Sequence, residues 1–310
     1  MKLTLNAYQK TAVTTVGATL FLIFVGGLVR AAGAGLGCPD WPKCFGSWVP
    51  PLTAAELPPG FEASQFNVFK TWTEYINRLI GLVIGLLITA TFLLSIRYRK
   101  EEPHVFYSSA AAFVLVLVQG WLGGQVVISG LEGWLVTLHM FLAMVIITAL
   151  LYAVFRATSR NLTIEINHAT RAWLLWTGAF LLLFTVVQLV LGTQVREAID
   201  LIKEGPNPPP RETWLSQVGR LDELHRSFSW TVFLSGGVVL YIARWRAESD
   251  LIGKLGLTIF GLIVFQILLG AGLWYLGMPP AYQVFHLVAA AFLICSEVLL
   301  LLLLWKSLES

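Results

Sequence analysis

The sequence predicts an all-α membrane protein with eight transmembrane helices, arranged as two pseudo-symmetric four-helix bundles. Hydrophobic residues make up 56% of its 310 residues and charged residues only 13%, with a mean hydropathy of +0.73. A soluble domain needs more charge than this to cover its surface. Eight apolar stretches are long enough to cross a bilayer, and the second half of the chain repeats the pattern of the first.

The apolar stretches cover residues 12–29, 74–96, 108–128, 134–155, 172–195, 224–243, 255–276 and 283–305. Little chain remains between them, so we expect no sizeable soluble domain. No signal-peptidase-like site follows the first stretch, which therefore predicts a membrane span. The N-terminus does not resemble an organelle transit peptide, and a bacterial inner (plasma) membrane is the expected location.

The basic residues predict the orientation of the chain in the membrane. With eight spans both termini lie on one side, and that side holds 12 of the 21 basic residues, against nine on the other. Several of the nine adjoin the end of a span rather than lie in a free loop. The positive-inside rule therefore places both termini in the cytoplasm and the loop after the first span in the periplasm or outside the cell. No basic patch indicates a nucleic-acid partner.

An internal repeat relates residues 1–160 to residues 161–310. The third, fifth and seventh stretches share Gln-x-x-x-Gly, whereas the first has Leu22 and Gly26 in those places. The second, fourth, sixth and eighth stretches carry Asn77, His139, His225 and His286 near their outer ends. Asn77 precedes His225 by 148 residues, and His139 precedes His286 by 147. Each half therefore predicts a four-helix unit.

The repeated His positions predict haem binding in both halves. Facing helices of a four-helix bundle often hold haem, and His is a common axial ligand. We expect His225 and His286 to ligate one haem and His139 to ligate another. A single intramembrane His more often packs or forms a hydrogen bond. Three at repeat-related positions favour iron.

Two repeat-related pairs of Arg lie at the outer span ends. Haem propionates are anions that prefer bidentate Arg partners, so these residues are candidate propionate ligands. The alternative is that each Arg extends to the interface to keep its charge in water. The residues are Arg30, Arg78, Arg196 and Arg226.

The two halves differ in a way that predicts different tasks. Glu74 lies three residues before Asn77 and thus on the same helix face, and its repeat partner is Asp222. A carboxylate at the edge of a span can be merely solvated. Beside a haem with one His ligand, Glu74 is instead a candidate for proton transfer or charge stabilisation. We therefore expect the first half to be the active site and the second half the cofactor site.

The predicted outer loop contains Cys-Pro-Asp-Trp-Pro-Lys-Cys, residues 38–44. A periplasmic face is oxidising, and the two Pro residues and the short spacing should hold Cys38 and Cys44 close together. We expect a disulfide, with two reduced thiols as the alternative.

These motifs resemble the haem A synthase family over nearly the whole chain. The most distinctive segments are residues 27–30 and 35–46, which include Cys-Pro-Asp-Trp-Pro, and residues 74–78, Glu-Tyr-Ile-Asn-Arg. Further similarity surrounds His139, His225-Arg226 and His286.

The resemblance implies an oxidoreductase that converts the C8 methyl group of haem O to the formyl group of haem A, for cytochrome oxidase. It implies haem b on His225 and His286, and haem O as substrate and haem A as product in the first half. The family's essential Glu matches Glu74, and its outer Cys pair matches Cys38 and Cys44. The Cys pair would shape the loop over the substrate or take part in redox chemistry. Expected partners are haem O synthase, cytochrome oxidase assembly factors, an unnamed electron donor and the lipid bilayer.

Asn77 departs from the family pattern, which has His at this place. Either the natural protein uses His139 alone, or Asn77 is a substitution that weakens or abolishes activity. Two other functions are compatible with the residues: a b-type electron-transfer cytochrome, which predicts identical fixed haems in both halves, and a non-catalytic haem carrier, which predicts exchangeable, unchanged haem.

Overall fold

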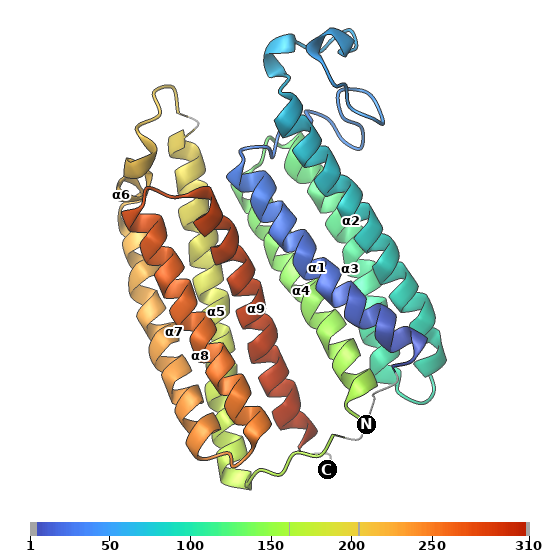
Figure 1. Ribbon diagram of the computed structural model, residues 1–310, viewed down its shortest axis with the longest axis vertical. Coiled ribbons are helices and arrows are strands. Elements are labelled where there is room, and N and C mark those ends of the chain that lie inside the picture. The colour runs from blue at the N-terminus through green and yellow to red at the C-terminus, as the bar shows by residue number, and fades with distance from the viewer. Residues whose placement is uncertain (1–4, 161, 204, 308–310) are drawn as a thin grey trace. The chain divides into compact units, whose positions relative to one another are not determined.

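The computed structural model describes residues 5–160, 162–203 and 205–307, and within these ranges the chain is helical, with no β-strand (Figure 1). This confirms the all-α prediction. The chain divides into two compact units, residues 1–158 and 159–310.

The first unit consists of four long helices packed in a ring. α1 contacts α2 and α4, and α3 contacts the same two helices, so that α2 and α4 are diagonally opposite. Its core contains the buried side chains Ile88, Ala112 and Leu150. The helices are α1 (Ala7–Ala31), α2 (Val68–Ser95), α3 (Pro103–Ile128) and α4 (Gly133–Thr158), with short 3-10 helices η1 (Ala54–Glu56), η2 (Ala63–Gln65) and η3 (Ile96–Tyr98).

Polar residues define where the first two helices begin. Asn6 and Gln9 form a capping box, because the side chain of each accepts a 3.0 Å hydrogen bond from the backbone N–H of the other. Asn67 caps α2 by accepting from the backbone N–H of Lys70 at 3.0 Å. α2 therefore begins before the apolar stretch that starts at residue 74. Its first two turns include Thr71 and Glu74, which form hydrogen bonds with the α1–α2 segment, residues 32–67.

The second unit repeats this ring. α5 contacts α7 and α9, and α8 contacts the same two helices, so that α7 and α9 are diagonally opposite. The helices are α5 (His168–Lys203), α6 (Trp214–Val218), α7 (Arg220–Trp245), α8 (Asp250–Tyr275) and α9 (Pro280–Lys306), with η4 (Arg211–Thr213) before α6.

α5 is longer than the predicted span 172–195, because an apolar cluster supports its last turns. Val195, Ile199 and Met278 are buried together, with α6 packed against them. The sequence Arg196-Glu197 had marked the end of the apolar stretch. The helix instead continues to Lys203 as an amphipathic extension.

Seven helices in the described part of the chain are long and apolar enough to cross a membrane, as expected of a multi-pass membrane protein. They are α1, α2 with η3, α3, α4, α5, α8 and α9. α7 has a sufficient length of 26 residues. It is not among the seven, and its first turns carry the charged residues Asp222, Glu223 and Arg226. The eighth span therefore stays a prediction.

Candidate functional site

A side-chain brace joins two neighbouring long helices at each of the three His positions. In each case the Gln of Gln-x-x-x-Gly donates from Nε2 to the backbone carbonyl of the His on the neighbouring helix. The pairs are Gln119 and His139 at 3.0 Å, Gln188 and His225 at 2.9 Å, and Gln266 and His286 at 2.9 Å. The Gln repeat was visible in the sequence, but its partner was not. The brace fixes the position of each His along its helix.

The Gly of the same motif lies against the imidazole ring. A Cβ atom added at Gly123 would lie 3.2 Å from Cε1 of His139, and one added at Gly192 would lie 3.2 Å from Cε1 of His225. The corresponding distance from Gly270 to Cε1 of His286 is 3.8 Å. The missing side chain lets each ring pack closely onto the neighbouring helix. Gln and Gly, one helical turn apart, therefore fix both the backbone and the ring of each His.

All three imidazoles have an unsatisfied nitrogen. The Nδ1 atoms of His139, His225 and His286 are buried, with no hydrogen-bond partner among the described residues. A buried polar atom without a partner costs about 1–3 kcal/mol, so the same feature at three related positions distinguishes these imidazoles from His residues that stabilise the fold by ring hydrogen bonds. Within the described ranges, no group of three or more His, Cys, Asp or Glu side chains could hold a metal ion. One or two imidazoles suit iron that is already held by a porphyrin.

The fourth repeat position lacks this arrangement. Asn77 lies on α2, and its Oδ1 atom is buried without a partner among the described residues. A Cβ atom added at Gly26, the counterpart of Gly192, would meet nothing within 4 Å. Leu22 replaces the bracing Gln. The first unit therefore departs from the repeat twice, with Leu22 in place of the bracing Gln and Asn77 in place of His.

Arg196 is a buried cation with unused donors. It lies on α5 one turn after Gly192 and is 7% exposed. Its Nη2 donates to Oδ2 of Asp200 at 2.7 Å, whereas Nε and Nη1 are buried with no partner among the described residues. Unpaired charged donors beside a His site fit an anionic ligand group such as a propionate.

The other Arg residues have different environments. Arg30 is partly buried in the last turn of α1. Arg226 donates from Nε to Oδ2 of Asp222 at 2.7 Å, and its guanidinium lies 4.0 Å from the ring centroid of Trp274. Its side chain is 48% exposed and lines an open pocket with Glu223 and Trp230.

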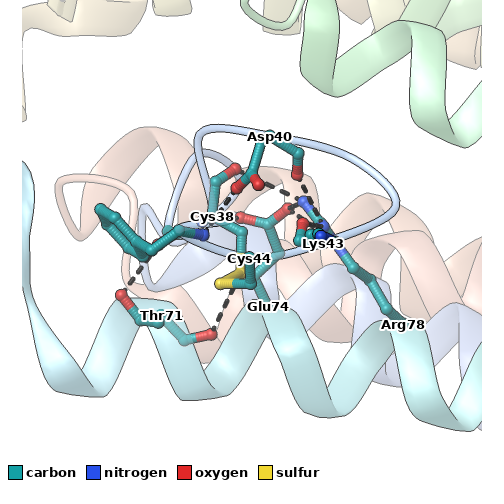
Figure 2. Close-up of polar contacts among 9 residues, drawn as sticks. Cys38, Asp40, Lys43, Cys44, Thr71, Glu74 and Arg78 are labelled. Atoms are coloured by element: carbon teal, nitrogen blue, oxygen red, sulfur yellow. Dashed lines mark hydrogen bonds and ion pairs between the residues drawn. A yellow bond between two sulfur atoms is a disulfide. The ribbon is translucent and has the colours of Figure 1, made fainter. Parts of the chain in front are cut away.

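The α1–α2 segment brings a disulfide next to Glu74. Cys38 and Cys44 are bonded, which confirms the predicted disulfide, and both are fully buried. The backbone N–H of Cys38 donates to Oε2 of Glu74 at 2.8 Å, and Oε1 of Glu74 pairs with Arg78 (Figure 2). Glu74 itself is 3% exposed. The sequence predicted the disulfide and the role of Glu74 but not the hydrogen bond between Cys38 and Glu74.

The same segment also reaches α3. A Cβ atom added at Gly124 would lie 2.7 Å from Cδ2 of Trp41, so the indole lies directly on the α3 backbone. Gly124 is next to Gly123, which packs against His139. The disulfide loop, residues 38–44, therefore contacts α2 through Glu74 and α3 through Trp41.

Comparison with known proteins identifies the family. Similar proteins named haem A synthase include one from Shewanella oneidensis, 25% identical over 94% of this chain and 95% of its own length. Others are from Bartonella tribocorum, 21% identical over 90% of this chain and 87% of its own, and Rhodopseudomonas palustris, 27% identical over 80% and 77%. A family model described as COX15-CtaA, cytochrome oxidase assembly protein, matches residues 9–298. Because this match spans most of its length, the chain belongs to the COX15-CtaA family of cytochrome oxidase assembly proteins.

Proposed function

We propose that this protein is a haem A synthase, an oxidoreductase that converts the C8 methyl group of haem O to a formyl group and so supplies haem A to cytochrome oxidase. The family match over residues 9–298 and the similar haem A synthases support this function. The observation that carries it is the brace repeated at His139, His225 and His286, each with an unsatisfied ring nitrogen.

The proposed enzyme is an eight-span protein of a bacterial inner membrane, built as two four-helix bundles. α7 is the eighth span, and its polar first turns lie at the haem site rather than in lipid. Both termini are cytoplasmic and the disulfide loop is periplasmic, as the distribution of basic residues favours.

The C-terminal unit binds haem b in this proposal. His225 on α7 and His286 on α9 are the ligands, supported by their place on diagonally opposite helices. The buried Nε and Nη1 of Arg196, which have no partner among the described residues, donate to one haem propionate. The more exposed Arg226 binds the other propionate. When bound there, haem b supplies a one-electron relay.

The N-terminal unit receives haem O, whose farnesyl tail stays in the lipid. His139 holds the iron, while Arg30, in the last turn of α1, is the candidate for a propionate. Asn77 leaves the opposite face without a strong ligand. The coincident loss of the bracing Gln at Leu22 favours a natural single-His site over one missing a native ligand.

Glu74 is the proposed catalytic residue of this unit. Counted with water as the oxygen source, conversion of a methyl group to a formyl group is R–CH3 + H2O → R–CHO + 4 H+ + 4 e−, so protons must leave the site and an electron acceptor must be reached. A carboxylate three residues from Asn77, and thus on the same helix face, can take up a proton or stabilise positive charge. The hydrogen bond from the N–H of Cys38 and the pairing with Arg78 hold this carboxylate in one orientation. The disulfide loop thus shapes the site.

Pigment analysis tests this function. The purified protein, expressed with haem O, is extracted and its haems are separated. We expect hydroxylated and formyl haem from the N-terminal unit, together with bound haem b. Two identical fixed haems b would instead indicate an electron-transfer cytochrome, and exchangeable, unchanged haem O would indicate a carrier. The active protein can then be used to identify its partners. The expected partners are a haem O synthase that supplies haem O, assembly factors that receive haem A, and an electron donor.

A further inference from the structure

All the hydrogen bonds of the Arg78 guanidinium are made to Glu74 and to backbone carbonyls of the disulfide loop. Nε donates to Oε1 of Glu74 at 3.2 Å, and Nη2 donates to the same oxygen and to the carbonyl of Cys38 at 3.4 Å. Nη1 donates to the carbonyls of Asp40 at 2.8 Å and Lys43 at 2.9 Å (Figure 2). These contacts use every N–H that a guanidinium has. None remains for a propionate.

The repeat partner of Arg78 behaves differently. Arg226 also pairs with the acidic residue four positions before it, Asp222. Its side chain is 48% exposed, against 16% for Arg78, and its guanidinium stacks over Trp274 instead of entering a loop. The same sequence relationship therefore serves two purposes. In the first unit it fastens the disulfide loop, which has no counterpart among the described residues of the second unit.

The loop is held along the first turns of α2 by further backbone contacts. The hydroxyl of Thr71 donates to the carbonyl of Gly37 at 2.8 Å. A Cβ atom added at Gly37 would lie 2.2 Å from the carbonyl oxygen of Lys70, so the two backbones touch. The carboxylate of Asp40 accepts from the N–H groups of Phe45 at 2.6 Å and Gly46 at 2.9 Å, which closes the loop on itself.

We propose that Arg78 is a positioning residue that locks the disulfide loop onto Glu74, and not a propionate ligand. Its cation bridges the carboxylate on α2 and three loop carbonyls, so the loop and Glu74 move as one unit. The role in haem oxidation rests on the proposed function, whereas the lock itself is a property of the folded chain.

The accessibility of the disulfide measures the lock directly. Because Cys38 and Cys44 are fully buried, a bulky reductant reaches them only when the loop opens. Membranes that contain the full-length protein are treated with a membrane-impermeant phosphine, and freed thiols are counted with a maleimide of high mass. A Cys295→Ala background removes the remaining cysteine.

Arg78→Gln should speed reduction roughly ten- to hundredfold, since it removes several charge-assisted hydrogen bonds. Arg78→Lys should give an intermediate rate, because an ammonium group has fewer donors and no planar fork. Arg97→Gln, in η3 directly after the far end of α2, is the control and should leave the rate unchanged. An Arg78→Gln rate equal to that of the unsubstituted protein would overturn the proposal. Retention of haem b in each variant verifies that it is folded.

Haem O saturation separates a positioning role from propionate binding. If Arg78 positions Glu74, Arg78→Gln lowers the maximal rate of haem A formation and leaves the half-saturating haem O concentration nearly unchanged. If it binds a propionate, the half-saturating concentration rises and the disulfide stays protected. An unsubstituted protein that makes no haem A would remove the proposed function, and the reduction rates would still decide the role of Arg78.

Discussion

The backbone N–H of Cys38 donates a 2.8 Å hydrogen bond to Oε2 of Glu74, although 36 residues separate them. This bond joins the disulfide to the carboxylate that we propose as catalytic. Oε1 of the same carboxylate is held by Arg78. Each oxygen of Glu74 is therefore bound either by the disulfide loop or by Arg78, which holds that loop. A change in the loop should reach the carboxylate without any other part of the unit moving.

Glu74→Gln should retain haem and lose product. The amide keeps an oxygen acceptor for the N–H of Cys38, so the fold should survive, but it carries no charge for Arg78 and takes up no proton. Haem A formation should fall roughly 10²- to 10⁴-fold, the usual contribution of general acid–base catalysis. Extraction and separation of the haems measures it. Asp222→Asn, at the repeat partner, is the control for loss of a paired carboxylate. Normal haem A yield from Glu74→Gln would remove Glu74 from the mechanism.

Gly192→Ala should weaken haem b binding. The added Cβ would lie 3.2 Å from Cε1 of His225, closer than most such contacts, so the ring must turn or the helices must separate. Changes next to a metal ligand typically cost roughly 10- to 100-fold in affinity, and we expect haem loss to accelerate within that range. Transfer of haem b to an excess of apomyoglobin gives the rate.

Two further glycines control for the general effect of Ala in a helix. A Cβ atom at Gly261 on α8, or at Gly26 on α1, would meet nothing within 4 Å. Gly261→Ala and Gly26→Ala should therefore release haem b at the original rate. Equal acceleration in all three variants would show that helix flexibility, and not contact with His225, is responsible.

The repeat made much of this architecture predictable from the sequence. An offset of 147 to 148 residues related Asn77 to His225 and His139 to His286, because duplicated helices keep their register. The direction of long side chains was not predictable. Arg78 and Arg226 occupy equivalent positions, yet one enters a loop and the other lies over Trp274. That choice depends on the additional loop length in the first half, which no periodicity encodes.

The end of α5 shows a second limit of the sequence. Arg196 marked the point where hydropathy falls, so the span was expected to stop at 195. Val195 and Ile199 are instead buried against Met278, so the helix continues to Lys203. Arg196 therefore lies in the interior, where it is 7% exposed. A tertiary contact between segments about 80 residues apart decided the outcome. The repeat therefore predicted Arg196 as a candidate propionate ligand but not its burial.

Arg196→Met should reduce haem b affinity without destabilising the haem-free protein. The buried guanidinium has two unpartnered donor atoms, Nε and Nη1. Such donors are unfavourable until an anion binds, so replacing them with an apolar chain is neutral or stabilising in the absence of haem. With haem bound, a lost charge-assisted contact should cost roughly tenfold or more in affinity. Haem titration and thermal unfolding of the haem-free form measure the two effects.

Arg246→Gln, at the opposite end of α7 from His225, supplies the comparison. It should change neither haem b affinity nor the stability of the haem-free protein by more than a small amount. If Arg196→Met instead destabilised the haem-free protein and left haem affinity intact, the ion pair with Asp200 would be the whole role of Arg196.

Asn77→His should convert the substrate haem from one axial His to two. Asn77 lies on α2, diagonally opposite α4 with His139, and its Oδ1 is buried without a partner among the described residues. An amide is a poor iron ligand, so the haem in the unsubstituted protein should keep an open face. An imidazole there would close it. In ferrous samples loaded with haem O, carbon monoxide should bind the unsubstituted protein and not Asn77→His.

The ligation and the activity of this variant answer different questions. His139→Ala should abolish the N-terminal haem signal in both backgrounds, which identifies the unit responsible. If carbon monoxide fails to bind the unsubstituted protein, the open face does not exist. Because Leu22 also replaces the bracing Gln, we expect no gain in haem A yield from Asn77→His alone. A large gain would mean that the site was built for two imidazoles and that Asn77 is a defect within it.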